Sequence, residues 1–168
     1  MAGPYELYLI RHAVAEERGD KWPDDAKRPL TADGAKKMKK AARGLASLGI
    51  AFDVILSSPL VRARQTADIV AAALDPHPSI VNVDSLSPGG SYSALVADLE
   101  KHLRRNRIAL VGHEPGIGEL AARLIGSRHP FEFRKGAVCR IDLDEIPPNG
   151  PGDLRWFAPT RVLRGIKT

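Results

Sequence analysis

Four basic side chains of two kinds could carry chemistry in this sequence. The pair Arg11-His12 and the single residue His113 each follow a short apolar run, and Arg62 lies just after a third run. Guanidinium groups match the geometry of phosphate oxygens, so arginines placed in this way indicate a site for an anion. Of two imidazoles beside such an anion, one can attack phosphorus and the other can donate a hydrogen bond to an oxygen. The residue types therefore point to a reaction at a phosphoryl group.

The elements before these residues should bring them together. Residues 5–10, 52–56 and 108–112 are short apolar runs that we interpret as strands. Ser58 and Pro59 are expected to cap and begin a helix that carries Arg62 in or near its first turn. Ligands of open α/β sheets bind beyond the carboxyl ends of the strands, where a helix N-terminus adds positive potential. We therefore expect the four side chains to converge in one crevice.

The rest of the chain continues this alternation of strands and helices. Thr31 is typical of an N-cap, and helical spacing of apolar residues continues to Gly49. A long polar loop over residues 14–29 is a candidate wall of the site. The helix that begins at Pro59 is predicted to continue to Leu74, further helices are predicted at 91–105 and 117–125, and strands at 80–83, 137–143 and 154–163. The pattern predicts an α/β fold with three layers, a mostly parallel central sheet and a C-terminal edge hairpin.

Three motifs at the ends of these elements resemble the histidine phosphatase superfamily. They are the Arg-His pair within residues 9–13, the segment Ser-Ser-Pro-Leu-Val-Arg-Ala-Arg-Gln-Thr-Ala at 57–67, and Val-Gly-His-Glu-Pro at 111–115. Arg-Pro-Leu-Thr at 28–31 agrees as well, and the motifs in order cover residues 5 to about 126. The resemblance implies a phosphoglycerate mutase-like fold.

The resemblance also implies a mechanism. His12 would attack the phosphoryl group, and water would then hydrolyse the resulting phosphohistidine. Arg11, Arg62 and His113 would hold the three equatorial oxygens, with Ser57 as a further candidate phosphate ligand. Phosphoryl transfer depends mostly on positioning and charge stabilisation, so neither a metal nor a cofactor is expected. His12 must be neutral to attack, and its other ring nitrogen should donate to a nearby backbone carbonyl.

A poor leaving group would need a proton donor. Glu114 is the first candidate because it follows His113, and Glu16, Glu17 and Asp84 are alternatives. The imidazole of a phosphohistidine leaves easily and needs a strong acid less.

One position departs from the family pattern, since Ala13 stands where glycine is most common. If the backbone there needed a positive φ, alanine would cost about 1 kcal/mol.

The short chain and the Gly-His-Glu-Pro motif are most similar to SixA-type phosphohistidine phosphatases. The mutases of the superfamily are usually longer and cover the pocket with extra helices, for which residues 84–107 leave little room. An open pocket would admit a protein that carries phosphohistidine. A phosphatase for a small phosphoester is the alternative, and a catalytically silent phosphate-binding module is a third.

Composition narrows the remaining possibilities. The net charge is +5, but the basic residues are dispersed and aromatic residues make up 5% of the chain, so nucleic-acid binding is not expected. With one cysteine, Cys139, the chain forms no internal disulfide. The N-terminal residues lack a signal-peptide pattern and no apolar run is long enough to span a membrane, so we expect a cytoplasmic protein. Because no repeat or linker divides residues 1–168, we expect one domain, and we expect a monomer.

Overall fold

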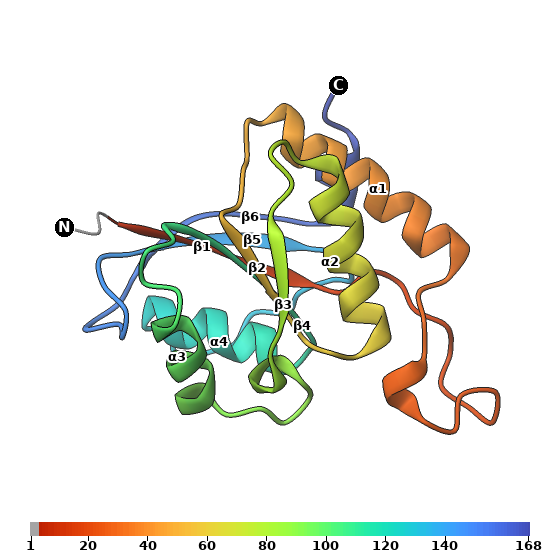
Figure 1. Ribbon diagram of the computed structural model, residues 1–168, viewed down its shortest axis with the longest axis horizontal. Helices are drawn as coiled ribbons and strands as arrows, with labels where there is room; N and C mark the ends of the chain where they lie inside the picture. Colours follow the sequence, from red (N-terminus) through yellow and green to blue (C-terminus); the bar gives the residue numbers. More distant parts are fainter. Residues whose placement is uncertain (1–3) are drawn as a thin grey trace.

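The computed structural model describes residues 4–168, so residues 1–3 of the expected domain and of the N-terminal segment lie outside it. Strands and helices alternate through most of this part of the chain (Figure 1). The strands are β1 (Tyr5–Arg11), β2 (Val54–Ser57), β3 (Ser79–Asn82), β4 (Arg107–Gly112), β5 (Val138–Leu143) and β6 (Asp153–Ala158). The helices are α1 (Ala32–Ser47), α2 (Val61–Ala73), α3 (Tyr92–Glu100), α4 (Gly116–Ile125) and α5 (Thr160–Arg164), with short 3-10 turns η1 (Asp25–Lys27) and η2 (Asp84–Leu86).

The strands form one six-stranded sheet in the order β3-β2-β4-β1-β5-β6. The pairs β1/β4, β2/β4 and β2/β3 are parallel, whereas β5 runs antiparallel to both β1 and β6. The expected mostly parallel sheet and its C-terminal edge hairpin are therefore confirmed. Because β1 and β4 are central neighbours, their carboxyl ends lie side by side.

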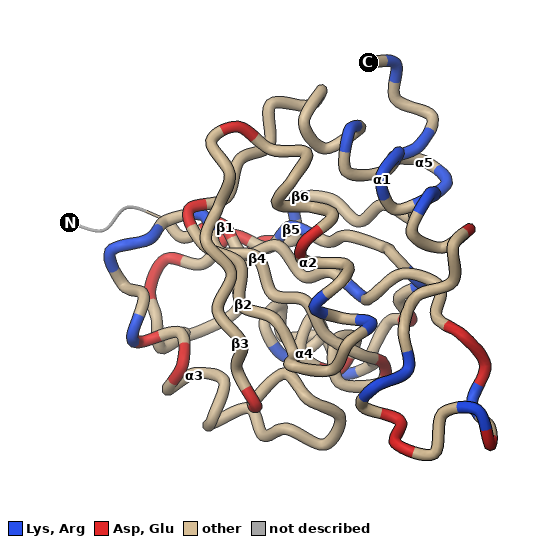
Figure 2. Tube along the Cα trace, turned by 45° about the vertical axis from the view of Figure 1, so that its right-hand side comes forward, with Lys and Arg blue, Asp and Glu red and all other residues tan. Residues whose placement is uncertain are grey.

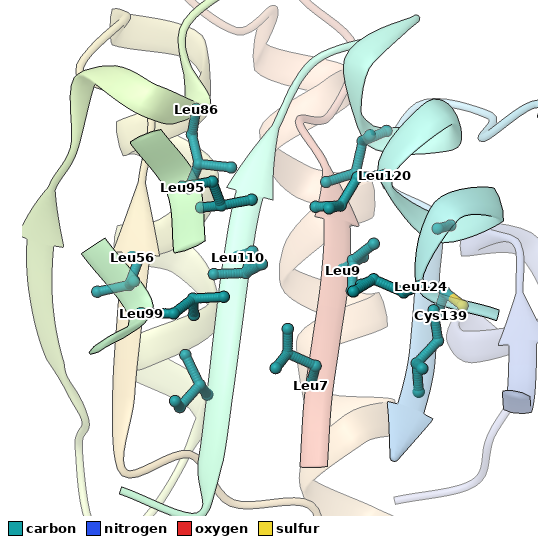
Figure 3. Packing of buried hydrophobic residues seen from close by; sticks show 14 of the residues in the cluster. Leu7, Leu9, Leu56, Leu86, Leu95, Leu99, Leu110, Leu120, Leu124 and Cys139 are labelled. Carbon is teal, nitrogen blue, oxygen red and sulfur yellow. The ribbon is translucent and has the colours of Figure 1, made fainter. Parts of the chain in front are cut away.

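Helices cover both faces of the sheet. Along β1, Leu7 and Leu9 belong to one buried cluster and Tyr8 and Ile10 to the other, as the alternation of side chains along a strand requires. The first cluster packs under α3 and α4 (Figure 3) and the second under α1, α2 and α5. Burial on both faces explains why the central strands have continuous apolar runs. The expected three-layer α/β/α architecture is confirmed.

Three predicted boundaries are wrong. Helix α2 begins at Val61 with Leu60 as its N-cap, because the Ser58 hydroxyl instead binds Leu60 N–H and His113. Helix α3 ends at Glu100, and the next residues form tighter i to i−3 turns that leave Leu103 exposed. The last predicted strand stops at Ala158, since Pro159 cannot donate to a ladder and α5 follows.

Other local predictions are confirmed. The Thr31 side chain caps α1 by accepting a hydrogen bond from Gly34 N–H. Arg62 is the second residue of α2, in its first turn. Among residues 4–168, no helix combines the length and the apolar character that a membrane span needs.

Candidate active site

The carboxyl end of β1 is held on both sides by backbone hydrogen bonds. His12 N–H donates to Gly112 O at 3.1 Å, which extends the pairing of β1 with β4 by one residue. Gly136 N–H lies 3.0 Å from His12 O and 3.1 Å from Arg11 O. Gly136 has a φ of +78°, and a Cβ there would clash with Thr160 Oγ1, so this position needs glycine. The backbone that carries Arg11 and His12 is thus fixed by two neighbouring segments.

The His12 ring is buried and oriented by one hydrogen bond. Its exposed fraction is 6%, and Nδ1 lies 2.7 Å from Ala13 O. A carbonyl oxygen can only accept, so Nδ1 carries the proton and Nε2 keeps its lone pair. The expected bond to a backbone carbonyl is confirmed. No described residue other than glycine has a positive φ, so the φ of Ala13 is negative. Alanine at this position therefore causes no backbone strain.

His113 lies beside His12 at the end of β4. The ring centroids are 5.1 Å apart with an angle of 57° between the planes. His113 Nε2 lies 2.8 Å from the hydroxyl oxygen of Ser58, and Ser58 is fully buried. The other ring nitrogen, Nδ1, is buried without a hydrogen-bond partner.

Arg62 enters the site from α2 and contacts the loop over residues 14–29. Its Nη1 donates to Asp25 O at 2.9 Å, and its Nη2 to Asp25 Oδ2 at 3.0 Å. Arg28 Nε donates to the other carboxylate oxygen of Asp25 at 2.9 Å. Arg62 is 2% exposed, and its Nε has no partner. The loop predicted as a wall of the site thus holds the arginine, and it carries the mixed charges at the lower right of Figure 2.

Arg11 and Glu114 meet the backbone of Phe133 on the other side. Arg11 Nη1 donates to Phe133 O at 2.7 Å, and Arg11 Nε is buried without a partner. The Glu114 carboxylate accepts Gly118 N–H at 2.9 Å and bonds the Phe133 backbone as well. Burial raises the pKa of Glu114 above its usual value.

The two histidines are held neutral at ordinary pH. Burial, with further contributions from the neighbouring His113 and from the charges of Arg62 and Arg11, lowers the pKa of His12 to about 3, although the hydrogen bond to the Ala13 carbonyl works against this shift. Burial followed by the charge of Arg62 lowers the pKa of His113 to about 4. Two neutral imidazoles therefore adjoin two guanidinium groups that retain unpartnered N–H donors.

The structure brings Arg11, His12, Arg62 and His113 together but treats the other candidates differently. Ser57 is fully buried, and its hydroxyl donates to Ser58 O at 2.9 Å. Glu16 and Glu17 lie in the loop along a second, shallower hollow, and Asp84 is an exposed residue at the start of η2. Among the proton-donor candidates, Glu114 alone adjoins a site arginine, since its charge acts on Arg11.

A cavity of about 370 Å³ opens beside His113. Its walls are the segment from η2 to the start of α3 and the first turns of α4, and they include Leu95, Ile117 and Glu114. Arg123 stacks over the Tyr92 ring at 3.6 Å and closes one side. The volume is within the range of small-ligand pockets.

Sequence reasoning missed two residues that organise the site, Asp25 and Ser58, and a third residue, Thr66, joins two of its segments. In the sequence Asp25 is one acidic residue among many in a polar loop, and the pattern around Ser58 predicts only a helix cap. Thr66 Oγ1 donates to Arg62 O at 2.8 Å and accepts Ala13 N–H at 3.1 Å, which joins α2 to the segment after β1. The signal for Ser58 and Thr66 was their place within the same motif as Arg62.

Comparison with known proteins agrees with this geometry. Residues 7–86 match the model of the histidine phosphatase superfamily (branch 1). An uncharacterized protein of Picosynechococcus sp. is 46% identical over 141 residues, covering 81% of this chain and 84% of the relative. Phosphohistidine phosphatase SixA of Escherichia coli is 28% identical over 153 residues, covering 90% and 91%. A solved structure of the protein histidine phosphatase SixA complexed with tungstate superposes with a TM-score of 0.83 at 26% identity, covering 94% of this chain and 99% of that one.

Proposed function

Because this chain belongs to the histidine phosphatase superfamily and is of SixA type, we propose that it removes the phosphoryl group from phosphohistidine on a partner protein. The single observation that carries the chemistry is the state of His12. Its ring is neutral, buried and fixed through Nδ1 to Ala13 O, so the lone pair of Nε2 is available for attack.

The first step transfers the phosphoryl group to the enzyme. Nε2 of His12 forms a bond to phosphorus while the bond from phosphorus to the leaving nitrogen breaks. The leaving imidazole takes the electron pair of that bond and a proton from solvent water. In the second step, water attacks phosphorus, the bond to Nε2 breaks and its electron pair returns to Nε2, the attacking water gives up a proton to solvent, and inorganic phosphate leaves. The net reaction consumes one water molecule and returns His12 to its neutral form.

Arg11, Arg62 and His113 hold the three equatorial oxygens in this proposal. The support is electrostatic as well as geometric, since the unpartnered Nε–H groups of both arginines are buried donors. A buried donor without an acceptor is unfavourable, and a phosphoryl oxygen would satisfy it. The charge on the phosphoryl oxygens would be matched by two guanidinium groups at low effective dielectric, which favours the transition state.

Glu114 is the proton donor we propose for leaving groups poorer than imidazole. Its pKa, raised by burial, keeps a larger share of the carboxyl group protonated than an exposed glutamate would have. It also lines the cavity beside His113, where a leaving group has room. This assignment matters for phosphoesters and little for phosphohistidine.

The cavity also favours a second candidate, a phosphatase for a small phosphoester, because about 370 Å³ would accommodate a metabolite. The two candidates differ in what occupies the cavity, namely a side chain of a protein or a whole small molecule.

We propose the cytoplasm as the place of action and a monomer as the active form, as the sequence predicts.

Turnover on a phosphohistidine protein, compared with a panel of sugar and acid phosphates, tests the substrate class. We expect the phosphohistidine protein to give the higher kcat/KM, and preference for one phosphoester would favour the second candidate.

His12→Ala should reduce turnover by more than about a thousandfold. The matched control is His129→Ala, since His129 is exposed and bonds only through its backbone. Full activity of His12→Ala would refute the mechanism.

A further inference from the structure

The hydroxyl group of Ser58 occupies a defined position between two polar groups. Its oxygen accepts Leu60 N–H at 3.2 Å and lies 2.8 Å from His113 Nε2. Within residues 4–168 these are its hydrogen-bond contacts, and the residue is fully buried. Leu60 N–H is a donor, so it cannot take the hydroxyl proton. The one acceptor within reach of that proton is therefore the His113 ring.

Neutral imidazole carries one proton, on either Nδ1 or Nε2. If the proton were on Nε2, it would point at Ser58 Oγ, and the hydroxyl proton would remain buried without an acceptor. If the proton is on Nδ1, the lone pair of Nε2 accepts the hydroxyl proton, and Nδ1–H is the one polar group of the pair left without a partner. The first arrangement leaves the hydroxyl proton and the Nδ1 lone pair unpaired, whereas the second leaves only Nδ1–H, which favours the second arrangement.

The consequence for the other side of the ring is direct. Nδ1 is buried and has no partner in the protein. Because Nε2 is used by Ser58, Nδ1 is the atom of His113 that can contact a bound phosphoryl group. With the proton on Nδ1, the ring is a donor to a negatively charged oxygen; in the other tautomer, a lone pair would meet that oxygen.

We propose that Ser58 is a positioning residue that fixes the tautomer of His113, so that Nδ1–H donates a hydrogen bond to a phosphoryl oxygen. The hydrogen bond from Nδ1–H to a phosphoryl oxygen rests on the function proposed above. The tautomer of His113 is a property of the free protein and does not rest on that function. His113 acts in this way as a neutral donor and keeps its proton throughout the transfer. Its proton stays on Nδ1, and no bond to hydrogen is made or broken at that ring.

Long-range ¹H–¹⁵N correlation spectra of histidine-labelled protein near pH 7 test the tautomer directly. The His113 signals are assigned by their absence from His113→Asn. We expect the Nδ1–H pattern in the wild-type protein and a loss of that preference in Ser58→Ala. An Nε2–H pattern in the wild-type protein would overturn the proposal, and this wild-type measurement does not depend on whether Ser58→Ala folds.

Kinetics then separate the role of Ser58 from a merely structural one. Ser58→Ala should lower kcat on phosphoramidate by about tenfold or more, and Ser58→Thr, which retains the hydroxyl group, should restore most of it. Ser127→Ala is the control, since its hydroxyl bonds only the backbone of His129. Equal losses in Ser58→Ala and Ser58→Thr would contradict the proposal. A wild-type protein with the Nδ1–H pattern but without turnover would refute the proposed function instead.

Discussion

Asp25 holds Arg62 through two different oxygens, its backbone carbonyl at 2.9 Å and its carboxylate at 3.0 Å. The first contact fixes the guanidinium group, whereas the second also places a negative charge beside the proposed phosphate site. A phosphoryl group must therefore bind next to a like charge. Asp25 thus fixes the orientation of Arg62, but its negative charge reduces the attraction of the site for an anion.

Asp25→Asn separates the two effects. The amide oxygen can still accept from Arg62, and the backbone contact remains, but the negative charge is lost. We expect inorganic phosphate to inhibit the variant at a concentration about threefold lower, with the difference declining as salt is added. Inhibition assays at low and high ionic strength measure this. Asp153→Asn is the control, because this exposed residue begins β6 at the opposite end of the sheet. Weaker phosphate inhibition in Asp25→Asn would show that orientation depends on the charge.

Glu114→Gln should affect leaving groups unequally. The glutamine keeps an oxygen for Gly118 N–H, so the start of α4 should be retained, but it has no acidic proton. We expect kcat for an alkyl phosphate to fall by about a hundredfold and kcat for phosphoramidate to change by less than about threefold. Steady-state assays with both substrates measure the ratio, and Glu100→Gln at the end of α3 is the control. Equal losses on the two substrates would mean that Glu114 is structural.

Gly116→Phe should narrow the cavity beside His113. A Cβ at Gly116 meets no atom within 4 Å, so a side chain has room there, and Gly116 is one of the residues that line the cavity. We expect KM for a phosphohistidine protein to rise about tenfold, or about 1.4 kcal/mol, whereas KM for phosphoramidate stays constant. Gly116→Ala is the control with a small side chain. If KM rose for both substrates, the cavity would not be the place of the leaving group.

The two histidines should also make stability depend on pH. The folded-state pKa values are about 3 for His12 and about 4 for His113, below the unfolded value of 6.5. The unfolded chain therefore binds more protons as pH falls below 6.5, and the free energy of unfolding decreases. The contribution is complete above pH 6.5 and is lost as pH falls toward the folded values. Between pH 6 and 5 the slope should approach about 1.4 kcal/mol per pH unit for each histidine.

Urea unfolding at pH 7, 6 and 5 measures this slope. His12→Gln and His113→Gln should each reduce it, and the double variant should reduce it further. Carboxylates contribute mainly below this window, so they do not mask the difference. A slope that is the same in all four proteins would show that the histidines are as easily protonated in the fold as outside it.

Much of the fold was predictable because burial on both faces gives the central strands unbroken apolar runs. The same runs end at Arg11 and His113, which made the convergence of the site residues predictable. The boundaries of the helices and strands near the C-terminus were less predictable. Leu163 fits a strand pattern locally, yet Pro159 stops β6, and Leu163 packs in the cluster beneath α1 and α2 instead.

The supporting residues were harder to predict for a physical reason. Asp25 contacts Arg62 across 37 residues and Ser58 contacts His113 across 55, so neither pairing leaves a local periodic signal. A serine before a proline has a strong local preference for capping, and that preference misled the interpretation of Ser58. Tertiary hydrogen bonds overrode it in the folded protein.

The pairing of β1 with β4 has a consequence for folding kinetics. Helices α1, α2 and α3 involve local contacts and can form early, but β1 meets β4 only after the long intervening chain has been closed into a loop. Pairings of such high contact order are slow compared with helix formation. Recovery of activity during refolding should therefore lag behind recovery of helical structure, because His12 and His113 directly follow two strands that pair late.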